Sequence, residues 1–480
     1  MEVVFLSSEV VPFAKTGGLA DVGRALPDAL AAAGIKVNVF MPLYGVVESK
    51  KAGIKKIKKL SLRFGGRTYA YEVCGKEEKG VNFYFIKQKI FFDREGIYGS
   101  LSGDYPDNAS RFIFFQKAVL HSLKSLKIKA DVIHLNDWQT ALVPKFLSNG
   151  QSRVPTVLTV HNLAYQGEYD AKSAKYAGLK KSEMLYGSRF NSLAYGISGA
   201  TAVTTVSPTY AKEMKTKKFG CGLEYFLKKR GPYFKGILNG LDYGLWNPSS
   251  DKAIAASYSA TSPEGKEKCK KALQKEMGLP QTDAMLVSFV GRLAMQKGMD
   301  IMVPALQRLI SGKIQFVMLG TGDVHYHRVL SVLAKRFPKN FALRLDFDDD
   351  MAHRIYAGSD LFLMPSQYEP CGLGQMIAFS YGAVPVVNKV GGLMDTVSEY
   401  SLHRKTGTGF LLEDYSSAAL EKALRKAMGI YGKRSRFREL SARCMRQRFS
   451  WQKSALKYIR LYNKLIDESG APPLRPLRKP

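Results

Sequence analysis

Short apolar runs alternate with amphipathic segments along most of the chain. Residues 286–290, LVSFV, form a continuous run of branched and aromatic side chains, which is typical of a strand buried on both faces. Residues 299–310 then place apolar side chains at helical spacing. The chain begins in the same way, with a predicted strand at 1–6, a helix that ends near Ala33 and a strand at 36–41. This alternation predicts an α/β protein built from parallel sheets.

The alternation occurs in two halves, separated by the turn-rich residues 237–248. In the second half the predicted strands are 286–290, 315–319, 341–345, 361–364, 384–387 and 408–411. In the first half, residues 55–90 alternate apolar and polar side chains and predict an antiparallel hairpin. We expect two Rossmann-like doubly wound domains that face each other across a deep cleft. The expected segments are a domain at 1–245, a domain at 246–450, a closing helix at 451–468 that packs back on the first domain, and a Pro/Arg-rich tail at 469–480.

Composition and cysteine usage place the protein in a reducing compartment. No apolar run approaches the ~20 residues that a membrane-spanning helix needs. The N-terminal residues lack the basic start of a signal peptide. We therefore interpret them as the first strand. The five cysteines are scattered and contain no CxxC pair, so neither a disulfide framework nor a zinc site is indicated. A cytoplasmic location, with no membrane partner, fits these observations.

The formal net charge of +31 is the unusual feature of the composition. It leaves open a basic binding protein for nucleic acid or anionic surfaces. However, the lysines are widely spread and no known nucleic-acid motif is present, so we expect no nucleic-acid partner. The densest run, residues 50–59, is interpreted as a solvated face.

Two cations follow the predicted strand 286–290. Arg292 and Lys297 lie on the loop at the carboxyl end of that strand, where open α/β sheets bind ligands. A guanidinium and an ammonium in one crevice can hold a diphosphate without a metal. A solvated loop with two surface charges remains an equally good interpretation of this stretch alone.

Other predicted strands also end in polar or glycine-rich loops. Gly17 and Gly18 follow the first strand and allow backbone N–H groups to approach an anion, although a tight turn explains them equally. Glu369 follows the strand 361–364 and is suited to hydroxyl recognition or to capping the next helix. Cys371 has no base beside it in the sequence, so a buried contact cysteine is favoured over a nucleophile.

Five motifs in a fixed order carry a specific resemblance. They are Lys15 to Val22 (KTGGLADV), Asp104 to Asn108 (DYPDN), Gly291 to Gly298 (GRLAMQKG), Glu369 to Leu373 (EPCGL) and Gly391 to Val397 (GGLMDTV). Together they resemble bacterial glycogen synthases and plant starch synthases from residue 1 to about 466. The resemblance implies a GT-B glycosyltransferase, a hexosyltransferase of family 5, that transfers glucose from ADP-glucose to an α-1,4-glucan such as glycogen with retention of configuration. We expect no cofactor, and no metal because the cation pair makes one unnecessary.

The resemblance also assigns roles to residues at matching positions. The implied catalytic residues are Arg292, Lys297, Glu369 and His161. The implied donor-binding residues are Lys15, Gly17, Gly18, Cys371, Gly372 and Leu373. The implied acceptor and glucose side consists of Asp137, Asn239, Tyr98, Asn162 and Asp21.

Some positions depart from the family pattern. Gln139 and Asp346 stand where relatives commonly carry histidine and glycine, and the second lies near the expected nucleotide site. The run 348–350 offers an Asp-x-Asp spacing, which we interpret as a solvated loop. The choice between ADP- and UDP-glucose therefore stays open, as does the choice between front-face attack and double displacement. A sucrose- or trehalose-phosphate-forming transferase is the alternative enzyme, and a nicotinamide dehydrogenase is disfavoured because neither half carries the dinucleotide fingerprint.

Overall fold

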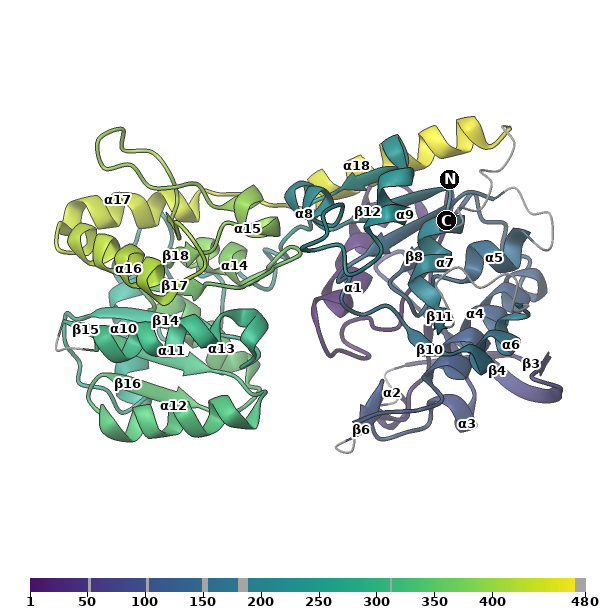
Figure 1. Cartoon of the computed structure of the whole chain (residues 1–480), viewed down its shortest axis with the longest axis horizontal. Coiled ribbons are helices and arrows are strands. Elements are labelled where there is room, and N and C mark those ends of the chain that lie inside the picture. Colours follow the sequence, from purple (N-terminus) through teal and green to yellow (C-terminus); the bar gives the residue numbers. More distant parts are fainter. Residues whose placement is uncertain (51–52, 101–102, 149–153, 180–188, 311–312, 471–480) are drawn as a thin grey trace. The chain divides into compact units, whose positions relative to one another are not determined.

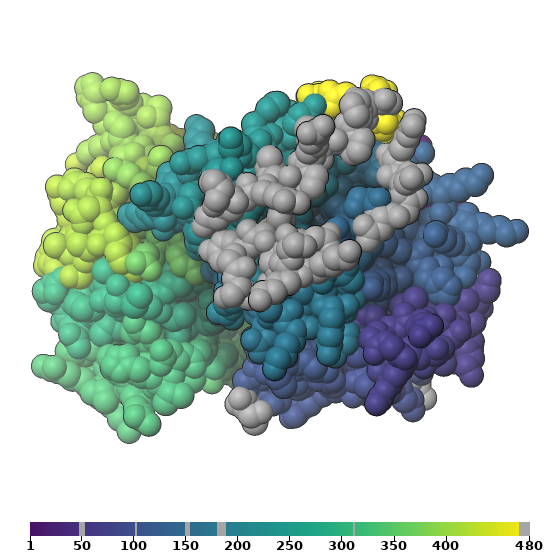
Figure 2. Space-filling model, turned by 45° about the vertical axis from the view of Figure 1, so that its right-hand side comes forward, coloured from purple at the N-terminus to yellow at the C-terminus, as the bar shows by residue number. Residues whose placement is uncertain are grey.

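The computed structural model describes the chain except residues 51–52, 101–102, 149–153, 180–188, 311–312 and 471–480. It divides into two compact units, Met1–Gly240 with Trp451–Pro480, and Leu241–Ser450. The expected tail lies outside the described residues from residue 471 onward. In Figures 1 and 2 the second unit is the continuous green to yellow-green body.

The N-terminal unit is built on a nine-stranded sheet with the order β13-β12-β9-β8-β1-β2-β5-β4-β3. Its parallel strands are β1 (Glu2–Leu6), β2 (Lys36–Pro42), β5 (Val81–Lys87), β8 (Val132–Asn136), β9 (Thr156–Val160), β12 (Ala202–Thr205) and β13 (Phe234–Gly236). Four of the five residues of β1 are fully buried, because helices cover both faces of this central strand.

Two long antiparallel strands extend one edge of that sheet. They are β3 (Lys55–Phe64) and β4 (Arg67–Glu78), and β4 pairs antiparallel with β5. The hairpin predicted over 55–90 is therefore confirmed. Most lysines of β3 are exposed on the outer strand, which is a common way to protect a sheet edge from further pairing. Within the basic run 50–59, the side chains of residues 50–52 are not among those that the structure describes.

The helices of this unit follow its strands. The main ones are α1 (Gly18–Ala32), α4 (Asn108–Ser125) and α18 (Trp451–Asp467), and α18 packs against α1. In Figure 1 this yellow C-terminal helix lies with the purple-to-teal elements of the unit. Shorter elements are α2 (Gly45–Lys50), α3 (Lys89–Phe92), α5 (Val143–Ser148), α6 (Ala174–Ala177), α7 (Ser192–Gly199), α8 (Pro208–Glu213), α9 (Glu224–Lys229), β6 (Gly99–Ser100), β7 (Gly103–Asp104), β10 (Glu168–Asp170) and β11 (Arg189–Asn191).

The C-terminal unit contains a six-stranded, all-parallel sheet with the order β16-β15-β14-β17-β18-β19. The strands are β14 (Met285–Val290), β15 (Ile314–Leu319), β16 (Phe341–Arg344), β17 (Leu361–Met364), β18 (Val384–Val387) and β19 (Phe410–Leu411). Numbered along the chain, this is the 3-2-1-4-5-6 order of a Rossmann sheet. The order reverses between β14 and β17, and ligands of such sheets bind in the crevice at that switch point.

Helices connect the strands of this sheet, as predicted. The connecting helices are α11 (Met299–Leu309), α12 (Val324–Arg336), α13 (Asp349–Gly358), α14 (Gly374–Ser380) and α15 (Gly391–Thr396). The helix α10 (Glu264–Glu276) precedes β14, and α16 (Ser417–Tyr431) and α17 (Arg434–Met445) follow β19. The solvated loop expected at 348–350 is wrong. Asp348 is the N-cap of α13, and its Oδ1 accepts from the Met351 amide at 2.8 Å, because a carboxylate satisfies the open N–H groups of a helix start.

Candidate functional site

The N-terminal unit collects its predicted site residues at the carboxyl edge of its sheet. Asp137 follows β8, His161 follows β9 and Asn239 lies shortly after β13. These strands and β1, which leads to Glu9, belong to one run of neighbours, β13-β12-β9-β8-β1. Side chains that are far apart in the sequence are therefore brought to one edge, as parallel strand order requires.

Glu9 organises the glycine loop at the start of α1. The residue is 3% exposed, and its carboxylate accepts hydrogen bonds from the Thr16 amide at 2.5 Å, the Thr16 hydroxyl at 2.7 Å and the Gly17 amide at 3.2 Å. The Gly17 amide, predicted to face the donor, thus already donates to a carboxylate. Gly18 is exposed at the first helical position, where an amide has no partner within the helix.

Lys15, Asp21 and Tyr98 surround the same loop. The Lys15 ammonium lies 2.9 Å from Oδ1 of Asp21 in a solvent-accessible ion pair. The Tyr98 hydroxyl donates to Oε1 of Glu9 at 2.6 Å and lies 2.7 Å from the Ser8 hydroxyl. Tyr98 was predicted to line the acceptor side, and in the structure its hydroxyl supports the glycine loop through Glu9.

Asp137 is held in a conformation that favours only glycine and short polar residues. Its φ of 53° is in the left-handed region, and its Oδ1 accepts from the His161 amide at 2.7 Å. Burial raises the pKa of Asp137 to about 7, and the charge of Glu9 adds to this effect. The carboxyl group therefore titrates near neutral pH, as functional acids commonly do.

His161 is neutral, and its hydrogen bonds define its tautomer. Asn136 Nδ2 donates to the Leu6 carbonyl at 2.8 Å, which leaves Asn136 Oδ1 as an acceptor. The Nε2 atom of His161 lies 2.9 Å from that oxygen and so carries the proton, while Nδ1 is an acceptor. Burial lowers the pKa of His161 to about 3. Asn162 lies beside it and its Oδ1 accepts from the Ala164 amide.

In the C-terminal unit, hydrogen bonds of Gln296 hold the loop after β14 in place. The Gln296 Nε2 donates to the Tyr368 carbonyl at 2.9 Å, and the Gln367 amide donates to the Gln296 carbonyl. Gln296 Oε1 accepts from Arg292 Nη2 at 3.1 Å, and Arg292 is exposed. Gln296 thereby ties the loop of the cations to the loop after β17.

Lys297 and Glu369 meet at the switch point of the sheet. The Lys297 Nζ lies 2.6 Å from Oε2 of Glu369, and the Ser366 hydroxyl donates to the same oxygen at 3.0 Å. The Glu369 side chain is 8% exposed and that of Lys297 is 22% exposed. A charged pair that water reaches on one side can exchange its partner for an incoming ligand.

The residues after Glu369 pack closely against α15. A Cβ at Gly391 would lie 1.9 Å from the Glu369 carbonyl oxygen, and one at Gly392 would lie 2.0 Å from the Cys371 carbonyl oxygen. The Gly392 amide donates to the Glu369 carbonyl at 3.1 Å. The glycine pair of the fifth motif is needed because two backbones touch there. Cys371 is buried, whereas Gly372 and Leu373 are half-buried.

Sequence reasoning missed two residues of the site. Glu9 had a usable signal, since it belongs to the polar group that follows the first strand, like Asp137 and His161 after theirs. Arg111 had none. It is fully buried on α4, and its guanidinium donates to the carbonyls of Phe91 and Ile97, which fixes the loop that carries Tyr98.

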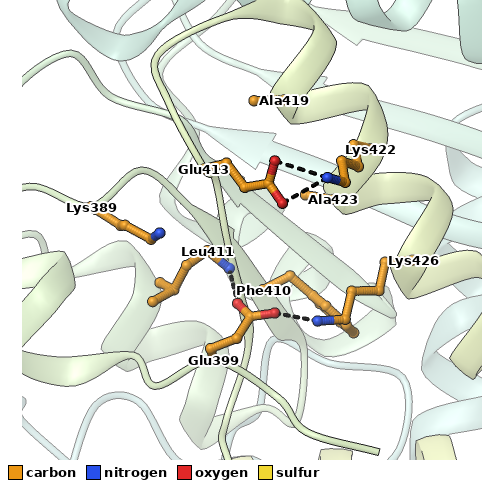
Figure 3. Close-up of a pocket in the computed structure, with 9 residues that line it drawn as sticks. All are labelled: Lys389, Glu399, Phe410, Leu411, Glu413, Ala419, Lys422, Ala423 and Lys426. Atoms are coloured by element: carbon orange, nitrogen blue, oxygen red, sulfur yellow. Dashed lines mark hydrogen bonds and ion pairs between the residues drawn. The ribbon is translucent and has the colours of Figure 1, made fainter.

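A hollow of about 230 Å³ opens elsewhere in the C-terminal unit, between β19 and α16 (Figure 3). Its two carboxylates already bind lysines: Glu413 accepts from Lys422 at 2.7 and 2.9 Å, and Glu399 accepts from Lys426. It contains no residue of the predicted site, and we assign it no role.

The described residues contain neither a candidate membrane span nor a candidate metal site. None of their helices is long and apolar enough to cross a membrane. Among these residues, no group of three or more His, Cys, Asp or Glu side chains is arranged to hold a metal ion.

Comparison with known proteins agrees with this geometry. Residues 2–229 match the starch synthase catalytic domain family, and residues 270–443 match glycosyl transferases group 1. The chain is 42% identical to glycogen synthase 2 of Geobacter sulfurreducens, covering 97% of this chain and 99% of the relative. It is 40% identical to the glycogen synthase of Thermosipho melanesiensis, covering 98% of this chain and 100% of the relative.

Solved structures show the same relationship. The catalytic domain of starch synthase IV from Arabidopsis thaliana superposes with a TM-score of 0.89 at 33% identity, covering 97% of this chain and 99% of that one. Sucrose-phosphate synthase from Thermosynechococcus elongatus shares only the fold, with a TM-score of 0.62 at 18% identity. Two Rossmann-like sheets with polar carboxyl edges define a GT-B glycosyltransferase, here a hexosyltransferase. The chain belongs to the glycogen and starch synthase family.

Proposed function

We propose that the protein transfers glucose from ADP-glucose to the non-reducing 4-hydroxyl of an α-1,4-glucan such as glycogen, with retention of configuration and release of ADP. The observation that carries this proposal is the pairing of Lys297 with Glu369 at the switch point, beside Arg292. A cation suited to a diphosphate thus lies next to a carboxylate suited to sugar hydroxyls, which supports the proposal. The similar starch synthase IV structure contains ADP and acarbose, which supports an adenine nucleotide donor.

In this proposal, Arg292 and Lys297 bind the diphosphate of the donor. Negative charge grows on the leaving oxygens as the anomeric bond breaks, and fixed cations stabilise that charge more in the transition state than in the ground state. Lys15 and the exposed Gly18 amide are the other proposed donor-binding groups, whereas the Gly17 amide donates to Glu9 and holds its loop. The cations do this without a metal or other cofactor.

Glu369 and the adjoining backbone hold the transferred glucose. The carboxylate accepts from the 3- and 4-hydroxyls, while the amides of residues 371–373 donate to them. His161 accepts from the 6-hydroxyl through Nδ1, because its Nε2 proton is already committed to Asn136. Its lowered pKa keeps the ring neutral at physiological pH, so this acceptor is retained.

The acceptor and glucose side of the proposal consists of Asp137, Asn239, Asn162 and Asp21. Tyr98 supports the glycine loop through its hydrogen bond to Glu9. In a front-face reaction the departing phosphate takes the proton of the acceptor 4-hydroxyl as the new bond forms. A double displacement through a protein nucleophile is the alternative. The five free cysteines support a reducing, cytoplasmic setting.

The test is to incubate the protein with glycogen and either ADP-glucose or UDP-glucose and to measure nucleoside diphosphate release. The proposal expects ADP release that depends on glycogen and a new α-1,4 linkage by NMR of the product. Preference for UDP-glucose would overturn the donor assignment. The absence of release with both donors would overturn the proposed reaction.

A further inference from the structure

The carboxamide of Gln375 lies beneath the loop that follows Glu369. Gln375 is the second residue of α14 and is fully buried. Its Nε2 donates to the Cys371 carbonyl at 3.0 Å and to the Gly372 carbonyl at 2.9 Å. One side chain therefore fixes two consecutive peptide groups of the loop.

These contacts decide where two backbone amides point. In a planar trans peptide, the C=O and the following N–H point in opposite directions. Because the Cys371 and Gly372 carbonyls face Gln375 in the interior, the amides of Gly372 and Leu373 face the opposite side. Both residues are half-buried, so part of this loop is open to solvent.

The loop packs closely against the Gln375 side chain, and Gly372 leaves no room for a Cβ. Gly372 has a φ of 74°, and a Cβ there would lie 2.4 Å from Oε1 of Gln375. Gln375 Nε2 also lies 3.2 Å from the Thr396 hydroxyl, which donates to the Gly392 carbonyl at 2.7 Å. The carboxamide thus joins the sugar-binding loop to α15, the helix of the glycine pair.

We propose that Gln375 is a positioning residue that aims the Gly372 and Leu373 amides at the hydroxyls of the transferred sugar and so sets selectivity at its 4-position. This inference rests on the proposed function, in which those amides bind the 3- and 4-hydroxyls. A donor whose 4-hydroxyl has the opposite configuration, such as ADP-galactose, cannot use both amides. Selectivity against it depends on how rigidly they are held.

The experiment compares Gln375→Met with a matched control, Gln274→Met. Gln274 is a fully buried glutamine of the same unit, donates to the Thr282 carbonyl at 3.0 Å, and like Gln375 has a buried Oε1 without a hydrogen-bond partner among the described residues. The measurements are kcat and KM with ADP-glucose and ADP-galactose, ADP affinity, and thermal unfolding.

A positioning role predicts that Gln375→Met lowers the glucose-to-galactose ratio of kcat/KM by ~10-fold or more, mainly through kcat, with ADP affinity within ~2-fold of wild type. Gln274→Met should lose stability but keep the ratio. Thr396→Val, a milder change, should lower the ratio by ~3-fold and provides the test if Gln375→Met does not fold. If Gln375→Met folds and its glucose-to-galactose ratio is unchanged, the positioning role of Gln375 is overturned. If Gln375→Met does not fold, an unchanged ratio in Thr396→Val overturns it. Neither result would affect the proposed function. A wild type that transfers no glucose from ADP-glucose would instead overturn the proposed function.

Discussion

The Nζ atom of Lys297 lies 2.6 Å from Oε2 of Glu369, so a single ion pair joins the loop after β14 to the loop after β17. The two residues belong to different sequence motifs and are 72 positions apart. The contact neutralises a nearly buried carboxylate while keeping an ammonium at the edge of the sheet. One pair therefore serves both stability and the proposed chemistry.

Lys297→Ala should reduce both activity and stability. Removing the cation leaves Glu369 without its charge partner at 8% side-chain exposure. Breaking a buried pair costs ~3–5 kcal/mol, and the partial exposure of Lys297 reduces the expectation to ~1–3 kcal/mol. Thermal unfolding and ADP release measure the two effects. The double variant Lys297→Ala with Glu369→Gln should recover part of the lost stability but none of the activity. If Lys297→Ala unfolds at the same temperature as the wild type, the ion pair contributes no stability.

Arg292→Ala should separate activity from stability. The side chain is exposed and its hydrogen bond to Gln296 spans 3.1 Å, so its loss should leave thermal unfolding unchanged. If the guanidinium stabilises the leaving diphosphate, kcat should fall by ~100-fold or more. Arg308→Ala, an exposed arginine of α11 paired with Glu421, is the control and should turn over normally. Near-normal kcat in Arg292→Ala would remove this residue from the mechanism.

Asp137→Asn should stabilise the protein more at alkaline pH than at acidic pH. The pKa of Asp137 is about 7 in the folded protein and ~3.9 in an unfolded chain. Between these values the unfolded state releases a proton that the folded state retains, so wild-type stability falls as pH rises, and the penalty is complete above pH ~7. Asparagine removes that penalty, which is worth up to ~4 kcal/mol.

The measurement is the difference in melting temperature between Asp137→Asn and wild type at pH 4.5 and pH 8.5. The control is Asp131→Asn, which changes an exposed carboxylate just before the start of the same strand. A difference that does not grow with pH would show that Asp137 is ionised in the ordinary way.

Glu9→Gln should weaken the glycine loop and lower activity by ~10-fold. The carboxylate accepts from two backbone amides and two hydroxyls, and it is an anion at the start of α1, where the helix dipole favours negative charge. In Glu9→Gln the side-chain NH₂ group would face the amide and hydroxyl donors that the carboxylate accepts from, so some of these hydrogen bonds would be lost. Steady-state ADP release and thermal unfolding report the change. Glu2→Gln, at the opposite end of β1, is the control, and equal behaviour of the two variants would count against the role of Glu9.

The exposed lysines of β3 should influence donor capture without affecting the chemical step. We expect the quadruple variant Lys55→Gln, Lys56→Gln, Lys58→Gln and Lys59→Gln to raise KM for the donor modestly at low salt. At ~0.15 M salt the Debye length is ~8 Å, so this difference should disappear. Saturated kcat should stay at the wild-type value throughout the salt series. A collapse of kcat would place this surface in the active site.

The sequence by itself determined the secondary structure and the candidate positions. All six strands predicted in the C-terminal unit are present within two residues of their predicted bounds, because a parallel strand buried on both faces must be a continuous apolar run. The polar residues after the strands were recognisable for a related reason. Parallel strands bring the loops at their carboxyl ends to one edge of the sheet, so Asp137, His161, Arg292 and Glu369 could be placed before any contact was known.

Only the tertiary structure decided which of these residues meet. Strand order is a long-range property, and the position of β17 next to β14 is what brings Glu369 to Lys297. The carboxylate of Glu9 on the Gly17 amide and the raised pKa of Asp137 likewise depend on neighbours from other strands and on burial. A local pattern records the polarity of a position. The partner of a side chain and the water around it are set by the packing of segments that are distant in the sequence.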